Sequence, residues 1–270
     1  MTTHGFRAPG SSLVPGDFTD LAHEYAAHRP GYDSSVAQVL VRRALNQGSV
    51  RFVDLGAGTG IWTRQVASQG SSAIRIQPVA VEPNRAMRDQ GRAHAGGPAI
   101  DWRAGSAEDS GLPASSADLL TMASALHWTV FDRASAEFAR VLRPGGVFAA
   151  LWNTRAIERD PLLVEIEAEL ARRVPGLERR SSGRSKFCAG LEQRLKDAGP
   201  WREVEYFEGE HVERFTVERY LGVWRSVNDA RAQAGETAFA DFLVWLERHL
   251  AGRAHVDATY HTLVWSARRA

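Results

Sequence analysis

A glycine-rich loop is the segment whose residue types and spacing most clearly indicate chemistry. It reads VDLGAGTG over residues 53–60, directly after a predicted strand and directly before a predicted helix. Glycine has no Cβ and tolerates positive φ, so the backbone N–H groups of such a loop can approach a ligand closely. Its spacing is G-x-G-x-G, and Ile61 stands where a dinucleotide fingerprint needs Gly or Ala. With Asp54 at the end of the strand, the loop predicts a ligand other than a dinucleotide.

Acidic side chains follow two further predicted strands. Glu82 ends the second strand, 22 residues after Gly60, where a carboxylate can accept hydrogen bonds from both hydroxyls of a ribose. Residues 105–109, GSAED, follow the predicted third strand, and there an acidic group and a backbone amide could read an adenine edge. Doubly wound sheets bind their ligands at the carboxyl ends of the strands. Together the three loops predict a nucleoside-binding site.

The elements that must position these loops alternate between strands and helices. Short apolar runs predict strands over residues 50–55, 79–81, 100–103, 117–122 and 147–151. Helical spacing predicts helices over 61–67, over 85–92 and after Phe131, and the RPGG at 143–146 ends the last of them. Such alternation indicates βαβ units and a parallel sheet with right-handed crossovers. We therefore expect an α/β, doubly wound, Rossmann-like domain.

The pattern changes beyond Trp152. Apolar residues recur at helical spacing over 162–170 and 239–250, and β-like runs cover 203–215, interrupted at Gly209, and 258–265. We expect two more strands that close the sheet, and helical insertions folded over one end of it. The predicted organisation is a mobile leader over residues 1–17 and a single domain over residues 18–270. Within that domain, residues 155–200 and 216–255 are expected to form a helical lid.

Composition excludes several classes of protein. Of the 270 residues, 44% are hydrophobic and 24% charged, which excludes wholesale disorder. The longest apolar run, 147–152, is far too short to span a bilayer, and the first residues lack the apolar core of a signal peptide. The single cysteine, Cys188, excludes an internal disulfide and fits a cytoplasmic protein. A net charge of +1 gives no electrostatic reason to expect nucleic acid as a partner. The oligomeric state does not follow from the sequence.

Five motifs together resemble those of a known enzyme family. They are VDLGAGTG, VEPN, GSAEDSGLP, SADLLTMASALHW and LRPGGVFAALWN, spread over residues 53–153. The chain resembles class I S-adenosylmethionine-dependent methyltransferases, and most of all the small-molecule group that includes trans-aconitate methyltransferases (the methyltransferase type 11 family). Upstream, YAAHRPGY from Tyr25 to Tyr32 is similar to that group's Y-x-x-x-R-P-x-Y segment. The resemblance covers residues 18–153, and the C-terminal third only loosely.

This resemblance implies a fold, a cofactor and a set of site residues. The fold is a seven-stranded sheet in the order 3-2-1-4-5-7-6 with the last strand antiparallel. The cofactor is S-adenosylmethionine and its product S-adenosylhomocysteine. Asp54 and the loop glycines, Gly60 included, would embrace the amino acid moiety, Glu82 the ribose, and Ala107 with Glu108 the adenine. The residues expected to bind the cofactor are Tyr25, Arg29, Asp54, Gly56, Ala57, Gly58, Glu82, Pro83, Met87, Ala107, Glu108 and Ser124.

The chain departs from the group's pattern on the acceptor side. Ser124 stands where the group usually has Gln, and the group's HWFD is here His127–Trp128–Thr129–Val130–Phe131–Asp132, with two extra residues. Several cofactor residues also have a structural interpretation. Asp54 could be a turn residue, Glu82 a helix-start carboxylate and Met87 part of the core, while Asp109 could take the place of Glu108.

His127 is the candidate catalytic residue. It follows the fourth predicted strand, at the sheet end where a methyl group would be delivered, and a near-neutral imidazole could take a proton from the acceptor. Alternatively it only positions the substrate, because in-line methyl transfer from a sulfonium depends chiefly on positioning. The candidate substrate-binding residues are Trp128, Trp152, Asn153 and Trp224. Aromatic faces suit planar substrates and a sulfonium, although tryptophans usually belong to the core.

The predicted function is methyl transfer to a small molecule held under the lid, with an aromatic compound of specialised metabolism as the candidate acceptor. The rivals are a non-catalytic S-adenosylmethionine-binding protein, an aminopropyltransferase, and a nicotinamide-dependent oxidoreductase that lacks its third glycine. No metal is expected, because the histidines have no ligand spacing. The arginine-rich stretch 172–184 is interpreted as a solvated loop that could also gate entry or attract an acidic substrate.

Overall fold

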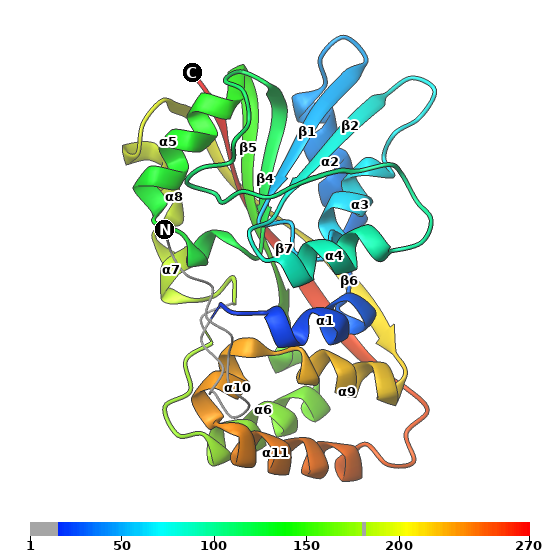
Figure 1. The fold of residues 1–270 in the computed structure, drawn as a ribbon. Helices are drawn as coiled ribbons and strands as arrows, with labels where there is room; N and C mark the ends of the chain where they lie inside the picture. The colour runs from blue at the N-terminus through cyan, green and yellow to red at the C-terminus, as the bar shows by residue number, and fades with distance from the viewer. Residues whose placement is uncertain (1–15, 180–181) are drawn as a thin grey trace.

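A single seven-stranded sheet organises the chain in the computed structural model, which describes residues 16–179 and 182–270. Its strands follow the order β3-β2-β1-β4-β5-β7-β6, and β7 runs antiparallel to both of its neighbours (Figure 1). The strands are β1 (Ser49–Leu55), β2 (Arg75–Val81), β3 (Asp101–Arg103), β4 (Ala117–Ala123), β5 (Leu142–Arg155), β6 (Trp201–Phe215) and β7 (Val256–Arg269). The predicted fold class and strand order are confirmed.

Helices cover both faces of this sheet. On one face α2 (Ser34–Ala44) and α3 (Ile61–Ala67) bury Leu40 and Trp62 against Phe52 of β1. On the other face α5 (Phe131–Val141), α7 (Lys186–Ala189) and α8 (Leu191–Asp197) share a cluster in which Phe138 stacks on Phe148 of β5. Helix α4 (Arg85–Ala93) meets β3 at Gly91, where a Cβ would lie 2.2 Å from the Trp102 ring. Both faces are covered, as a mostly parallel sheet requires.

A separate group of helices lies beyond one end of the sheet. Helices α6 (Pro161–Arg173), α9 (Val217–Arg225), α10 (Asn228–Ala234) and α11 (Glu236–His249) are drawn together below the sheet in Figure 1. They share an apolar cluster with the ends of β6 and β7, which includes Trp224, Phe242 and Tyr260. We call these four helices the lower layer. Helix α1 (Ala22–His28) contacts both α9 of this layer and α4 of the sheet.

Residues 155–200 do not form one helical unit. Helix α6 belongs to the lower layer, whereas α7 and α8 pack on the sheet face, because Cys188, Leu191 and Leu195 are buried in the same cluster as Phe138 and Trp201. Within the described residues, the remaining elements are the short 3-10 helices η1 (Thr19–Leu21), η2 (Leu126–Trp128) and η3 (Ile157–Arg159).

Two glycine-containing segments lie within continuous strands. Strand β6 runs through Gly209, where a Cβ would lie 2.8 Å from Cγ of Asp33 and 2.9 Å from Val36 Cγ2. The glycine therefore lets α2 approach the strand and does not interrupt it. Helix α5 ends at Val141, just before the RPGG segment, as predicted. Strand β5 starts at Leu142 rather than at the predicted Val147, so it includes that segment.

The predicted leader lies mostly outside the described residues, which begin at Gly16. The Gly16 N–H donates to Asn228 Oδ1 at 3.0 Å, and the Asn228 side-chain amide donates to the Asp17 carbonyl at 2.8 Å. The start of the described chain is thus bonded to α10. Across the described ranges, none of the helices has the length and hydropathy needed to cross a membrane.

Candidate functional site

A cavity of about 340 Å³ lies where the carboxyl ends of β1, β2, β4 and β5 meet the lower layer. This is the end of a doubly wound sheet at which ligands bind. Thirteen of the predicted site residues line it: Tyr25, Arg29, Gly56, Ala57, Gly58, Glu82, Pro83, Met87, Ala107, Glu108, Ser124, Trp128 and Asn153. Asp54, His127, Trp152 and Trp224 are not among the lining residues.

The glycine loop has a backbone that few other residues could adopt. Gly56, Gly58 and Gly60 have φ values of +66°, +57° and +79°. A Cβ on Gly56 would lie 2.8 Å from the Ala125 Cβ. The N–H groups of Gly56 and Ala57 donate to the Val81 carbonyl at 2.8 and 3.2 Å. The loop is therefore joined to the end of β2 and opens onto the cavity.

Glu82 holds the glycine loop and the turn after β2 together. One carboxylate oxygen accepts from the Gly58 N–H and the other from the Asn84 N–H, both at 2.8 Å. Burial raises the pKa of Glu82 above its usual value, while these two N–H donors act in the opposite direction. Each carboxylate oxygen keeps a lone pair that can accept one more hydrogen bond from a ligand in the cavity. The two hydroxyls of a ribose could donate such a pair of hydrogen bonds.

Apolar and acidic groups form the neighbouring wall. Met87 is buried, and a Cβ on Gly58 would lie 3.3 Å from its Cε, so the glycine keeps the space between them open. Glu108 accepts from the Val130 N–H at 2.8 Å. Val130 is one of the two extra residues after Trp128, so this insertion fixes the 105–109 loop.

Asp54 lies beneath the loop rather than on the cavity wall. It is fully buried and accepts from Thr63 Oγ1 at 2.6 Å and from Thr121 Oγ1 at 2.9 Å. Trp62 Nε1 donates to the same Thr121 hydroxyl at 3.0 Å. Burial raises the pKa of Asp54 to about 7, although both threonines lower it. Through these hydrogen bonds Asp54 connects β1 to α3 and β4, and its direct contact with a ligand stays a prediction.

His127 also differs from its expected position. Its Nδ1 accepts from Trp152 Nε1 at 3.2 Å, which leaves the proton of the neutral ring on Nε2. Burial lowers the pKa of His127 to about 4, with the charge of Asp229 opposing that shift. The ring packs on Trp128 with 4.5 Å between centroids. His127 thus joins the cavity residue Trp128 to the core.

The two remaining tryptophans belong to cores. Trp152 is fully buried on the sheet face and packs against Phe187 and Trp265. Trp224 is fully buried in the lower layer and packs on Phe242. This burial agrees with the alternative that the sequence left open, in which these tryptophans belong to the core rather than to the substrate site.

The segment around α1 closes the cavity on one side. Arg29 donates through Nε to Ser226 Oγ at 2.8 Å and through Nη2 to the Ser226 carbonyl at 3.0 Å. Its guanidinium lies 5.0 Å from the centre of the Tyr25 ring. Tyr32 and Ser124 share a hydrogen bond of 3.1 Å between their hydroxyls. This segment therefore joins the sheet loops to the lower layer beside the cavity.

The candidate site residues named from the sequence did not include the lining residues at the lower layer. These are chiefly Arg155, Arg179, Ser182, Asn228, Asp229 and Tyr260. They come from the end of β5, the loop after α6, the start of α10 and β7, so no local motif connects them. Two signals were available. Arg155 follows the predicted fifth strand at the ligand-binding edge of the sheet, and the arginine-rich stretch 172–184, interpreted first as a solvated loop, contains Arg179 and Ser182.

Comparisons with known proteins agree with the geometry of the sheet end. Residues 53–150 match the family model described as a methyltransferase domain. An uncharacterized methyltransferase of Mycobacterium bovis is 38% identical over 138 residues, 51% of this chain and 52% of that protein. A ubiquinone/menaquinone biosynthesis C-methyltransferase of Rubrivivax gelatinosus is 39% identical over 112 residues, 41% of this chain and 42% of that protein. The chain thus matches about half the length, or less, of these curated relatives.

A solved structure resembles nearly the whole chain. It comes from Anaeromyxobacter dehalogenans, is provisionally named a type II methyltransferase, and is 28% identical with a TM-score of 0.63. The match covers 90% of this chain and 98% of that one. The resemblance to class I methyltransferases is therefore confirmed, while the finer one to trans-aconitate methyltransferases stays a prediction.

Proposed function

We propose that this chain, whose residues 53–150 match the methyltransferase-domain family model, transfers a methyl group from S-adenosylmethionine to a small-molecule acceptor. The observation that carries the proposal is the cavity at the sheet end, walled by the glycine loop, by Glu82 and by Met87. The name of the Rubrivivax relative, a quinone-biosynthesis C-methyltransferase, supports an acceptor that is a small molecule.

The lining residues fit the parts of this cofactor. Glu82 supplies a carboxylate for the two ribose hydroxyls, and Met87 with Ala107 supplies an apolar wall for the adenine. Glu108 and the backbone of its loop would read the adenine edge. Tyr25 and Arg29 would lie near the amino acid end, where the aromatic face of Tyr25 suits a cation. The cofactor would supply an electrophilic methyl group, and the residues of the chain would bind and position the two molecules.

Positioning is the main contribution that we assign to these residues. Displacement at a methyl group needs the acceptor in line with the breaking bond. A site that binds both molecules in this geometry lowers the activation barrier, because binding has already offset the entropy lost when they are brought together. Trp128 and Asn153 would line the acceptor side. The lower layer and α1 would act as a lid that excludes water. His127, tied to Trp152, is assigned the role of holding Trp128 in place, since its ring does not line the cavity.

Calorimetric titration of S-adenosylmethionine, S-adenosylhomocysteine and NAD tests the proposal. Wild type should bind the first two at micromolar concentrations. Glu82→Ala should weaken both by at least about 100-fold, since each of the two hydrogen bonds to the charged carboxylate is worth about 1.5–3 kcal/mol. The control is Glu165→Ala, which removes a carboxylate on α6 that is 61% exposed. Tighter binding of NAD, or no binding of any of the three, would reject the proposal.

A further inference from the structure

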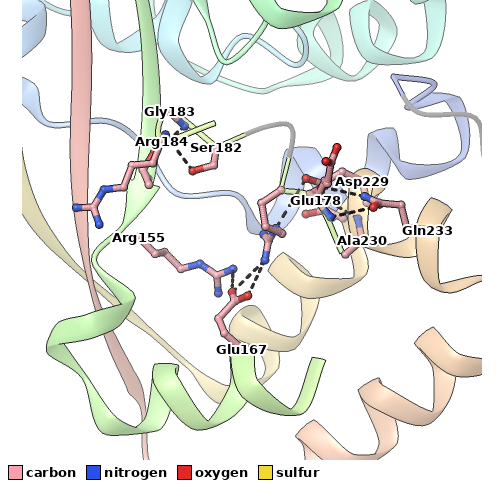
Figure 2. A network of polar contacts seen from close by, with 12 residues as sticks. Arg155, Glu167, Glu178, Ser182, Gly183, Arg184, Asp229, Ala230 and Gln233 are labelled. Atoms are coloured by element: carbon pink, nitrogen blue, oxygen red, sulfur yellow. Dashed lines mark hydrogen bonds and ion pairs between the residues drawn. The ribbon is translucent and has the colours of Figure 1, made fainter. Parts of the chain in front are cut away.

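Two arginines from distant parts of the chain meet at one carboxylate beside the cavity. Arg155, at the end of β5, donates through Nη2 to Glu167 of α6 at 3.0 Å. Arg179, in the loop after α6, donates through Nη1 to both oxygens of the same carboxylate at 3.0 and 2.8 Å. Figure 2 shows the dashed contact between Arg155 and Glu167, with Asp229 and Gln233 nearby in the same network. Both arginines line the cavity.

The cluster is buried to an extent that charged groups rarely tolerate. The side chain of Arg155 is only 9% exposed and that of Glu167 18%. The Arg155 guanidinium lies 4.5 Å from the centre of the Trp224 ring, and that of Arg179 5.7 Å. Although burial opposes the charge, the neighbouring Tyr220 and Glu167 raise the pKa of Arg155 above its ordinary value, so it stays cationic. Burying such charges is costly unless each gains partners.

The guanidinium groups keep hydrogen-bonding capacity that the described residues do not use. A guanidinium carries five N–H donors. Those of Arg155 donate to the Tyr220 hydroxyl at 3.1 Å and to Glu167, which uses two of the five within the described chain. Nε of Arg179 is buried without a hydrogen bond inside residues 16–179 and 182–270, and Asp229 Oδ2 lies 3.8 Å away. Donors of this kind on a cavity wall favour an acceptor-rich ligand group.

Neutral polar groups complete this end of the cavity. Thr154, Ser182 and Tyr260 line it beside the two arginines. The charges of Arg155 and Arg179 are opposed by Glu167 and, at 3.8 Å, by Asp229. Because these carboxylates are already present, a singly charged and planar group fits better than a doubly charged phosphate. Arginine forks match planar carboxylates in geometry.

We propose that the methyl acceptor carries a carboxylate, which Arg155 and Arg179 bind at the lower-layer end of the cavity. The inference rests on the proposed function, because it concerns the substrate of that same site. Glu167 is a positioning residue that holds both guanidinium groups toward one place. The aromatic acceptor expected from the sequence is compatible with this assignment if its ring bears an acid.

Benzoate, benzamide and phenyl phosphate are suitable probes because they share a ring and differ in the group attached to it. Each is titrated calorimetrically into protein saturated with S-adenosylhomocysteine. Benzoate should bind wild type at least about tenfold more tightly than benzamide or phenyl phosphate. Arg179→Gln should remove that preference while leaving S-adenosylhomocysteine affinity unchanged. Arg179→Lys, which keeps the charge without the fork, should retain part of it.

The matched control is Arg172→Gln, in the same arginine-rich stretch. Arg172 is 67% exposed and pairs with Glu169 on α6, outside the cavity lining. This variant should bind all three probes as wild type does. Equal binding of benzoate and benzamide, no binding of either up to about 10 mM, or a preference for phenyl phosphate would overturn the inference while the proposed function stands. Failure to bind S-adenosylhomocysteine itself would overturn both.

Discussion

The two ends of the cavity are built on different principles. At the sheet end, backbone groups and short loops at the carboxyl ends of neighbouring strands form the wall, with Gly56 and Glu82 as examples. At the lower-layer end, side chains from β5, β7, α10 and the loop after α6 form it. The family model covers residues 53–150, hence the first end and little of the second. The sheet end is thus formed by short loops that follow single strands, whereas the lower-layer end is formed by segments far apart in the sequence.

The largest effect is expected where the sheet end is disturbed in its backbone. Gly56→Ala places a Cβ at φ +66° and 2.8 Å from the Ala125 Cβ. Strain and overpacking together should lower the free energy of unfolding by about 2–5 kcal/mol and abolish measurable S-adenosylhomocysteine binding. Denaturant unfolding and calorimetry check both effects.

Gly96→Ala is the matched control for Gly56→Ala. It has a similar φ of +82°, but a Cβ there meets nothing within 4 Å. It should cost only about 1–2 kcal/mol and leave binding intact. If the two variants behaved alike, the close fit of the loop would not be the feature that builds the sheet end.

The next effect concerns the buried support of the sheet end. The pKa of Asp54 is raised by burial from 3.8 to about 7. Between these values the folded state holds a proton that the unfolded state has lost, so this group lowers stability as the pH rises through that interval. Asp54→Asn should therefore gain stability relative to wild type from pH 4 to pH 7, by on the order of a few kcal/mol at about 1.4 kcal/mol per pKa unit. Denaturant midpoints across this range measure the gain.

Asp118→Asn should change stability in the opposite direction, with the variant less stable than wild type. Asp118 bonds to Arg51 and Arg143, and their donors outweigh burial and lower its pKa to about 2. This stabilisation is present above pH 3.8 and is lost as the pH falls toward 2, so the variant should be less stable than wild type at neutral pH.

For Asp54→Asn, a stability difference from wild type that did not change with pH would show that the Asp54 carboxyl stays charged in the folded protein.

A smaller effect is expected where the two ends are joined. Gly222 of α9 faces α1, and a Cβ there would lie 2.2 Å from the His28 ring. Gly222→Ala should lower the free energy of unfolding by about 1–3 kcal/mol, against the gain of about 1 kcal/mol that alanine brings to an uncrowded helix. Because α1 carries Tyr25 and precedes Arg29, S-adenosylhomocysteine should also bind several-fold more weakly.

Gly190→Ala serves as the control for this contact, since a Cβ at Gly190 meets nothing within 4 Å and its φ of −115° is ordinary. It should leave both stability and binding near the wild-type values. Unchanged binding in Gly222→Ala would show that the sheet end works independently of α1, which would separate the two ends of the cavity further.

Errors of sequence interpretation followed the same division. The helix over residues 61–67 agrees with the structure because its periodicity is a local signal, and the strand order agrees with the one that the resemblance to class I methyltransferases implied. Gly209 was interpreted as a break, since the approach of Asp33 and Val36 to that strand cannot be seen in the chain around it. Asp54 and His127 were placed in the site by motif, but their partners, Thr121 and Trp152, lie in other elements.

The sequence by itself determined which strands and loops carry the nucleoside-type site, because positive φ at glycine and a carboxylate at a strand end are properties of consecutive residues. Only the tertiary structure decided that Arg155, Glu167 and Arg179 share one place, that α7 and α8 cover the sheet, and that Asp54 supports the loop from below. The physical reason is that burial and side-chain pairing depend on which segments pack together, and residues far apart in the chain carry no local record of that contact.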